Sequence, residues 1–327
     1  MSVLLAFSSA YPAHNLDILK NECIERSRRD FAAMKKESKI TVNGRLMGYY
    51  GFENSASALI LLDVSNTNVQ LTKMNISFTN LIMLHASNSG LEKIDDIGNE
   101  TFPSLKFLNL SHNAISSVVS NVFSHLRELE VLDLSFNCFV HFNYDHVFLR
   151  HEHLKKIFLH DNLLHSVRGT AGLNHIMHLD MLDLKRNIIE EFNDFNLQVK
   201  HLELKSNALQ TLEIHHAQSM TLDASENNLT SFVALGRFTR LDLSRNDFKF
   251  LSQVEIKEAK ILNLSYNQIE SCLESSVGAE SDEETNFSNE DGNERDGMIT
   301  EILDISHNNV SSMKDLHLFK FCESIIL

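Results

Sequence analysis

Tryptophan is absent from this chain of 327 residues, and proline, cysteine and glycine are scarce, with two, four and 11 copies. So few glycines argue against a loop that cradles phosphate, and the sequence contains neither a Gly-x-Ser-x-Gly nor a His-Glu-x-x-His motif. All apolar runs are shorter than the ~20 residues that cross a bilayer. We therefore expect no enzyme and no cofactor, and membrane anchoring stays undetermined.

The pattern that is present is Leu-x-x-Leu-x-Leu-x-x-Asn. It begins in full form at residues 105, 129, 154, 179, 199, 238 and 259, and in looser form at 59, 81, 219 and 300. Within each copy two apolar residues stand two apart, as Leu108 and Leu110 do, which is the spacing of a short strand that turns both toward one face. One copy cannot bury its own leucines, so copies must stack. The repeat predicts an α/β leucine-rich-repeat solenoid with a curved parallel β-sheet on its concave face and loops or short helices on its convex side.

An asparagine follows each of the later strands, and its amide can bond backbone groups left free where the chain turns. We interpret these asparagines as a structural ladder rather than as ligands. Thr67 and Ser89 hold the equivalent position in the first two copies. The ladder consists of Asn113, Asn137, Asn162, Asn187, Asn207, Asn227, Asn246, Asn267 and Asn308.

The chain divides into three predicted parts. Residues 1–14 look like the remnant of a signal peptide, and residues 15–58 lack the repeat and are expected to form a helix and a strand-turn-strand that cap it. The repeats fill residues 59–327 in about 11–12 copies, the last of which is cut inside its strand. Within them, residues 273–298 hold nine acidic residues against one arginine, a composition that predicts a disordered insertion.

Repeat length and cysteine content add two further expectations. Ladder positions 22–25 residues apart leave room for a longer convex segment, whereas those 19–21 apart must return by a tighter, less regular path. The four cysteines, at 23, 138, 272 and 322, match no zinc motif and allow three pairings, which the sequence leaves open.

The concave face carries the candidate partner-binding residues. An apolar stripe there has nothing to gain from the leucine core and indicates a contact surface, although packing of the stripe against itself or against the N-terminal segment is an equal alternative. The stripe and its neighbours are Leu61, Met83, Phe107, Val131, Phe136 and Phe158. A basic band follows, formed by Lys156, Lys185, Arg186, Lys205, Arg240 and Arg245. An acidic column beside it, at Asp133, Asp183, Glu203, Asp223 and Asp242, favours a solvated, mutually neutralised face and argues against nucleic acid as a partner.

Histidines and glycosylation motifs complete the candidate sites. Eight of the 17 histidines fall between residues 141 and 178; polar residues on convex turns are the favoured interpretation, over a metal site or a pH sensor. The candidate glycosylation sites are Asn75, Asn99, Asn228, Asn286 and Asn309. Two further sequons, at Asn109 and Asn263, point into the concave face, and a glycan on Asn109 would cover part of the stripe.

The mixture of full-length and compressed copies, together with residues 202–214 and 241–251, resembles the secreted leucine-rich immune proteins of insects, within the extracellular leucine-rich-repeat family. That resemblance implies an extracellular, non-enzymatic innate-immune factor that binds other proteins, with microbial surfaces as a further class of ligand. The alternatives are the cell-surface ectodomain of a Toll-like or adhesion receptor, and an intracellular scaffold.

Overall fold

The computed structural model describes residues 13–34, 40–42, 45–47, 58–67, 77–94, 101–118, 122–144, 147, 151–168, 177–194, 197–215, 217–271, 298–310 and 319–327. The first 12 residues, the acidic stretch up to residue 297, Cys272, Asn75, Asn99 and Asn286 lie outside these ranges. The chain forms two compact units, Met1–His201 and Leu202–Leu327. In the described part of either unit, no helix is long and apolar enough to cross a membrane.

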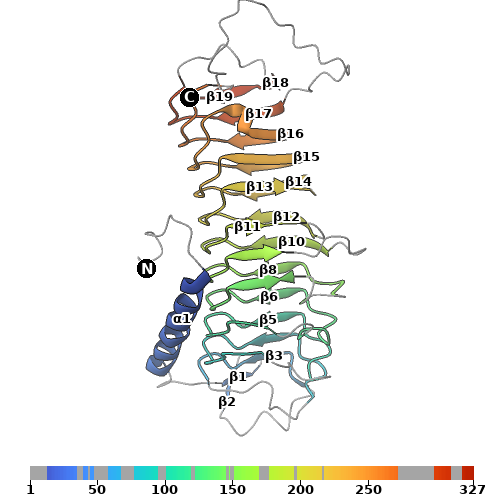
Figure 1. Ribbon diagram of the computed structural model, residues 1–327. Coiled ribbons are helices and arrows are strands. Elements are labelled where there is room, and N and C mark those ends of the chain that lie inside the picture. Colours follow the sequence, from blue (N-terminus) through green and yellow to red (C-terminus); the bar gives the residue numbers. More distant parts are fainter. Residues whose placement is uncertain are drawn as a thin grey trace, which may run out of the picture. The chain divides into compact units, whose positions relative to one another are not determined.

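The main sheet of the first unit is parallel and follows the repeat (Figure 1). Each of its first five strands buries its middle residue and leaves the residues on either side partly exposed or exposed, as alternation along a strand requires. Neighbouring strands pair in register, so the buried Leu108 lies between Leu84 and Leu132. In order, the strands are β3 (Leu61–Asp63), β4 (Met83–His85), β5 (Phe107–Asn109), β6 (Val131–Asp133), β8 (Lys156–Phe158) and β10 (Met177–Asp183). The side that carries the first and third strand residues is called the outer sheet face below.

A β-hairpin covers the first edge of this sheet. Strands β1 (Ile40–Val42) and β2 (Arg45–Met47) pair antiparallel, and β1 also pairs antiparallel with β3. Because an unpaired edge is open to association with other chains, the hairpin protects the stack where its parallel strands begin.

The return segments of the first unit are turns and short strands. Early in the chain they are turns that bury Phe123 and Leu126, whereas later they form a second parallel sheet of β7 (His141–Asn143), β9 (Ser166–Arg168) and β11 (Glu191–Phe192).

Helix α1 (Ala13–Met34) lies along the side of the stack rather than across its edge (Figure 1). Its buried stripe includes Leu16 and Cys23, seven residues or two turns apart. Cys23 forms a disulfide with Cys138, and Arg28 holds Glu92 through two bonds of 2.7 and 2.8 Å. The structure therefore contains a disulfide that fastens α1 to the fourth repeat, and Cys322 is free.

In the second unit, the segments that connect one strand of the main sheet to the next are themselves largely strands. Its elements are β13 (Thr211–Ile214), β14 (Gln218–Asp223), β15 (Ser231–Asp242), the 3-10 helix η5 (Leu251–Gln253), β16 (Val254–Asn263), β17 (Met298–Asp304), β18 (Phe319–Phe321) and β19 (Ser324–Ile326), while β12 (Leu197–Glu203) holds the boundary between the units. The long strands β15 and β16 pair at both ends, Ala234 with Ile256 and Leu241 with Leu262. The compressed repeats therefore return as extended strands, and the pairings of β14 with β15 and of β15 with β16 carry register shifts along this tighter path. Leu262 pairs in turn with Leu303, so the register continues across the acidic stretch.

Candidate interaction surface

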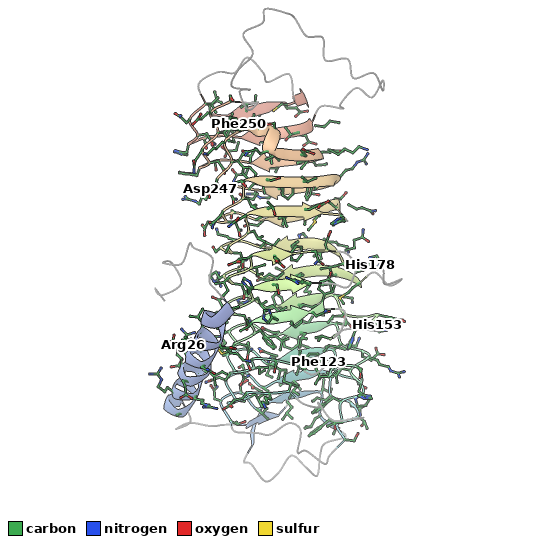
Figure 2. The ribbon with its side chains drawn as sticks, viewed as in Figure 1. Arg26, Phe123, His153, His178, Asp247 and Phe250 are labelled. Atoms are coloured by element: carbon green, nitrogen blue, oxygen red, sulfur yellow. A yellow bond between two sulfur atoms is a disulfide. The ribbon has the colours of Figure 1, made fainter. Side chains whose placement is uncertain are left out.

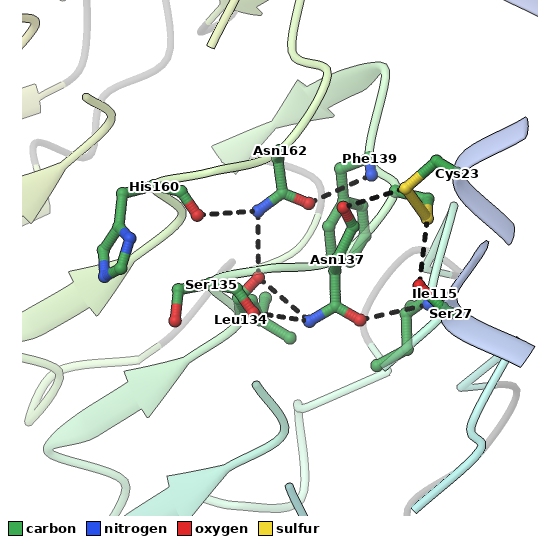
Figure 3. The surroundings of a disulfide bond; sticks show 10 residues. Cys23, Ser27, Ile115, Leu134, Ser135, Asn137, Phe139, His160 and Asn162 are labelled. Atoms are coloured by element: carbon green, nitrogen blue, oxygen red, sulfur yellow. Dashed lines mark hydrogen bonds between the residues drawn. A yellow bond between two sulfur atoms is a disulfide. The ribbon is translucent and has the colours of Figure 1, made fainter. Parts of the chain in front are cut away.

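The ladder asparagines are fully occupied by the backbone. Asn137 donates from Nδ2 to the carbonyls of Leu134 and Ser135, both at 3.1 Å, and its Oδ1 accepts the Ile115 N–H at 3.1 Å (Figure 3). Its Nδ2 also donates to the Leu110 carbonyl of the preceding repeat, at 3.0 Å. Each of the nine donates to the backbone of its own turn. These side chains hold neighbouring coils together, and they have no donor to spare for a ligand.

A left-handed residue precedes every ladder position. All of these residues have φ between 47° and 61° and none is glycine, although this conformation costs a residue with a Cβ about 1–2 kcal/mol. The column comprises Asn66, Asn88, His112, Phe136, Asp161, Arg186, Ser206, Glu226, Arg245, Tyr266 and His307. Sequence reasoning missed it as a column, because its members share a backbone conformation and no side-chain chemistry. Their position immediately before the ladder residue was the available signal.

Neighbouring members of this left-handed column interact. In the first unit the rings of His112 and Phe136 stack at 4.2 Å, and Arg186 binds Asp161 at 2.9 and 2.5 Å. The pKa of Asp161 is set by opposing causes: burial raises it, but the hydrogen bonds from Arg186 and His160 prevail and hold it below its ordinary value. In the second unit Arg245 lies 4.3 Å from the Tyr266 ring centroid.

The acidic column is structural and only partly solvated. The carboxylate of Asp133 accepts the backbone N–H and the hydroxyl of Ser135, at 2.9 and 2.6 Å, and Asp223 and Asp242 do the same with the serines two residues on. Asp183 is 2% exposed. The expected solvated face is therefore correct only in part: Asp183 and Asp242 are buried, and Asp133, Glu203 and Asp223 are partly exposed. The carboxylates of Asp133, Asp223 and Asp242 also close the turn after the strand.

The basic band is divided between the two units, and most of it is paired. Within the first unit Lys185 binds the Asp183 carboxylate at 2.8 Å, and Arg186 is held by Asp161. Within the second, Lys205 lies 3.3 Å from Glu226, Arg240 lies 3.3 Å from Asp242, and Arg245 covers Tyr266. Lys156 is exposed, and among the described residues no ion pair involves it.

The apolar stripe forms one row of the outer sheet face. Leu61, Met83, Phe107 and Val131 are paired in register and partly exposed. Ile60 and Ile82, which directly precede the row, are 54% and 37% exposed. Because these two residues stand before the strand pattern, sequence reasoning did not include them. The row is therefore an apolar, partly exposed part of the outer sheet face, and Ile60 and Ile82 add exposed apolar side chains next to it in the sequence.

Aromatic and imidazole rings continue this surface. The His85 and Phe107 ring centroids lie 5.1 Å apart, and Phe136, 39% exposed, contacts His112 and His160. His160 Nδ1 lies 2.7 Å from the Asp161 carboxylate. Phe158 pairs in register with Asp133 and Asp183. We call His85, Phe107, His112, Phe136, Phe158 and His160 the histidine–phenylalanine surface.

The clustered histidines between residues 141 and 178 do not assemble a site in the described ranges. His153 and His178 are exposed on the side of the first unit opposite Arg26 of α1 (Figure 2). His153 lies in a bend, as expected of these polar residues, whereas His178 lies in strand β10. His151 is buried instead, with Nε2 2.8 Å from the Phe123 carbonyl oxygen. Among the residues that the structure describes, no three potential ligands gather as a metal site would need.

The described sequons differ in their surroundings. Asn109 and Asn263 lie on the outer sheet face and accept backbone hydrogen bonds from Ser111 and Ser265, at 2.9 and 3.0 Å. Asn228 and Asn309 each follow a ladder asparagine, where Asn228 is partly exposed and Asn309 exposed. The glycosylation candidates that the structure describes belong to the second unit, whereas Asn109 borders the apolar stripe within the first unit.

Comparison with known proteins identifies the repeat. Residues 79–139 match the family model described as leucine rich repeat, and no curated protein matches the chain in sequence. Together with the parallel sheet of stacked coils, this makes the fold a leucine-rich-repeat solenoid.

Three solved structures illustrate the range of similarity. The leucine-rich repeat domain of APL1B is 16% identical, with 79% of this chain and 71% of that chain covered and a TM-score of 0.39. The LRIM1/APL1C complex is 17% identical, with coverage of 78% and 52% and a TM-score of 0.40. A leucine-rich repeat protein from Bacteroides eggerthii is 13% identical, with coverage of 78% and 43% and a TM-score of 0.46. The chain thus spans about half the length of the last two.

Proposed function

We propose that this chain is a non-enzymatic, protein-binding leucine-rich-repeat protein that engages its partner through the outer sheet face of the first unit. The observation that carries the proposal is the partly exposed row of Leu61, Met83, Phe107 and Val131 beside the exposed Ile60 and Ile82. Contiguous apolar surface of this kind marks interaction sites on soluble proteins. Buried aromatic anchors carry much of the energy of such contacts, and Phe107 lies at the middle of the row.

We place this function outside the cell, in innate-immune recognition or scaffolding. The disulfide between Cys23 and Cys138 supports an oxidising compartment, because disulfides persist in secreted and cell-surface proteins. The same observation is compatible with the ectodomain of a receptor, which is our second candidate, and it disfavours the intracellular scaffold. Detection of the folded chain in the medium or on the surface of expressing cells distinguishes the two candidates.

The binding surface is tested by replacing Phe107 and Val131 with aspartate together. Both residues are partly exposed, so the fold should persist when two negative charges are placed in the apolar row. A partner that covers the row must then remove water from both carboxylates, which weakens its binding. Immobilised wild-type chain captures proteins that are then identified and titrated individually. We expect the double variant to weaken each such titration at least about tenfold, a change of about 1.4 kcal/mol.

The matched control carries His153→Asp and His178→Asp, which add the same charges at exposed positions on another side of the first unit. This control should bind as the wild type does. Unchanged affinity of the Phe107/Val131 variant, with its fold intact by circular dichroism, refutes the proposed surface.

A further inference from the structure

We infer that the histidine–phenylalanine surface is a pH-dependent docking site for an acidic, apolar protein segment, which it binds more tightly in acid. The inference rests on the proposed function, because the same face of the first unit is used. It adds the chemistry of the partner and a condition for binding.

The rings supply the pH dependence. Histidine is the side chain whose ordinary charge change falls between pH 5 and 8. His85 lies against Phe107, and His112 and His160 both lie against Phe136. A neutral imidazole packs on a phenylalanine ring, and an imidazolium is attracted to the face of such a ring. Protonation therefore changes the charge of the surface without dismantling it.

The charges around the three histidines nearly balance before they are protonated. On the neighbouring strands and turns of the first unit, six acidic groups are Asp63, Glu130, Asp133, Asp161, Asp180 and Asp183, and five basic groups are Lys106, Lys155, Lys156, Lys185 and Arg186. Six acidic and five basic groups leave a net charge of −1, and three protonated imidazoles raise it to +2.

Most acidic groups in this set are engaged with partners other than the three histidines, whereas Asp161 lies 2.7 Å from His160 Nδ1 and pairs with that ring when it is protonated. Glu130 is shared by Lys155 and Lys106, whose hydrogen bonds lower its pKa to about 2. Asp133 is bound by Ser135, and Asp183 by Lys185.

The partner must supply apolar side chains as well as negative charge. Met83, Phe107 and Val131 run beside the histidines in one row of the sheet, and burying them needs apolar contacts. A protein segment with interleaved acidic and apolar residues offers both. A nucleic acid offers the charge and base stacking but no aliphatic side chains to cover the row.

The experiment measures fluorescence anisotropy of three labelled probes with the whole chain. The probes are a peptide of alternating Glu and Leu, the same length of alternating Lys and Leu, and a single-stranded oligodeoxynucleotide. We expect the Glu–Leu peptide to bind about tenfold more tightly at about pH 5.5 than at about pH 7.5, through several ion pairs of modest strength. The Lys–Leu peptide should show the opposite trend.

Two triple variants locate the effect. His85→Asn, His112→Asn and His160→Asn together should remove the pH dependence, and asparagine tolerates the left-handed backbone at position 112, where φ is 54°. His125→Asn, His153→Asn and His178→Asn replace exposed histidines outside this surface and should leave the dependence as in the wild type. Circular dichroism at both pH values establishes that each protein is folded.

The outcomes separate this inference from the proposed function. Equal binding of the Glu–Leu peptide at both pH values overturns the inference, as does loss of pH dependence in the control triple. Binding of the oligonucleotide without the Glu–Leu peptide replaces the protein partner with a nucleic acid. If the peptide binds regardless of pH and Phe107→Asp with Val131→Asp abolishes that binding, the proposed function stands and only the inference fails.

Discussion

The ladder asparagine shows how a single side chain links two coils, because Asn137 bonds carbonyls from its own turn and from the preceding repeat. Replacing Asn137 with alanine leaves the buried Ile115 N–H without its acceptor, whereas the Leu110 and Leu134 carbonyls keep the amides of Asn113 and Asn162 as donors. An unsatisfied buried group costs about 1–3 kcal/mol. We therefore expect the free energy of unfolding in urea to fall by about 1–3 kcal/mol.

Asn309→Ala is the comparison for this substitution, since Asn309 is exposed. Its effect should stay within about 0.5 kcal/mol, as for ordinary surface positions. Similar losses in the two variants would contradict a structural role for the ladder.

The left-handed column offers a second test, at Phe136, where φ is 52°. Phe136→Ala and Phe136→Gly both remove the ring contacts with His112 and His160, so their difference reports the backbone alone. Glycine adopts this conformation without a steric penalty, and we expect the glycine variant to be about 1 kcal/mol more stable than the alanine variant in urea denaturation.

The same pair of substitutions at Phe107, within strand β5, should give the reverse order, because glycine weakens a strand. If alanine is the more stable variant at both positions, the left-handed strain does not contribute as argued.

Residue by residue, the sequence predicted what depends on local spacing. The ladder and the buried leucines could be read directly, since each recurs at a fixed place in the repeat. The Asp133 turn could also have been identified, because Asp-Leu-Ser places a hydroxyl and an N–H two residues after the carboxylate. Ring contacts such as His112 with Phe136 join residues 24 positions apart, and their formation requires the stacking geometry.

Among the elements, α1 depends on one covalent link to the repeats. Cys23→Ser removes the bond to Cys138 and opens a loop that spans 115 residues. Closing a loop of that length restricts the unfolded chain, and loss of such a disulfide typically costs about 2–5 kcal/mol. We expect this loss in urea denaturation, and reduction of the wild type should reproduce it.

Two controls accompany the Cys23 experiment. Cys322→Ser alters a cysteine that is free in the structure and should leave stability unchanged. Arg28→Ala removes an exposed contact between α1 and Glu92 and should cost no more than about 1 kcal/mol. A Cys23 variant as stable as the wild type would show that α1 docks without the bond.

His141, in strand β7 of the second sheet of the first unit, should make the free energy of unfolding depend on pH. Partial desolvation lowers the pKa of His141, an exposed residue of β7, below its ordinary value, and the positive charges of His165, Arg168 and Lys20 add to the effect. The unfolded chain then binds this proton more readily than the folded chain does. The stabilising contribution is present above about pH 6.5 and is lost as the pH falls below that value toward the depressed pKa.

His141→Asn should therefore show a smaller loss of stability than the wild type between about pH 7.5 and about pH 5.5. His153→Asn, at an exposed position, serves as the control and should follow the wild type. Chemical denaturation at each pH measures the difference, and parallel curves for all three proteins would contradict the assignment to His141.

The type of secondary structure was predictable wherever the leucine motif recurs, whereas the position at which one element packs on another was not. The parallel strands follow from the period-two leucines. The secondary structure of the return segments in the compressed repeats could not be assigned from the sequence. In β15 and β16 the return segment and the leucine-bearing strand form one long strand. The position of α1 depends on a partner cysteine 115 residues away, and four cysteines alone do not select one pairing.

For the whole chain, stability comes from contacts between successive coils, since each repeat buries its leucines against its neighbours. This organisation explains why the fold and the row of Leu61, Met83, Phe107 and Val131 could be predicted from one motif, while the rest of the proposed binding surface could not. The motif specifies the buried positions. It leaves Ile60, Ile82 and the left-handed column unspecified, and those exposed positions are where repeats of one fold differ.

The same organisation predicts that damage stays local. Leu132 is fully buried between its neighbours Leu108 and Ile157, and Leu132→Ala should cost about 2–5 kcal/mol through lost contacts and a cavity. Because each repeat contacts only the adjacent ones, amide hydrogen exchange should accelerate most in residues 105–160. Protection in residues 241–264 of the second unit should stay as in the wild type, and equal acceleration in both ranges would mean that the repeats unfold as one cooperative block.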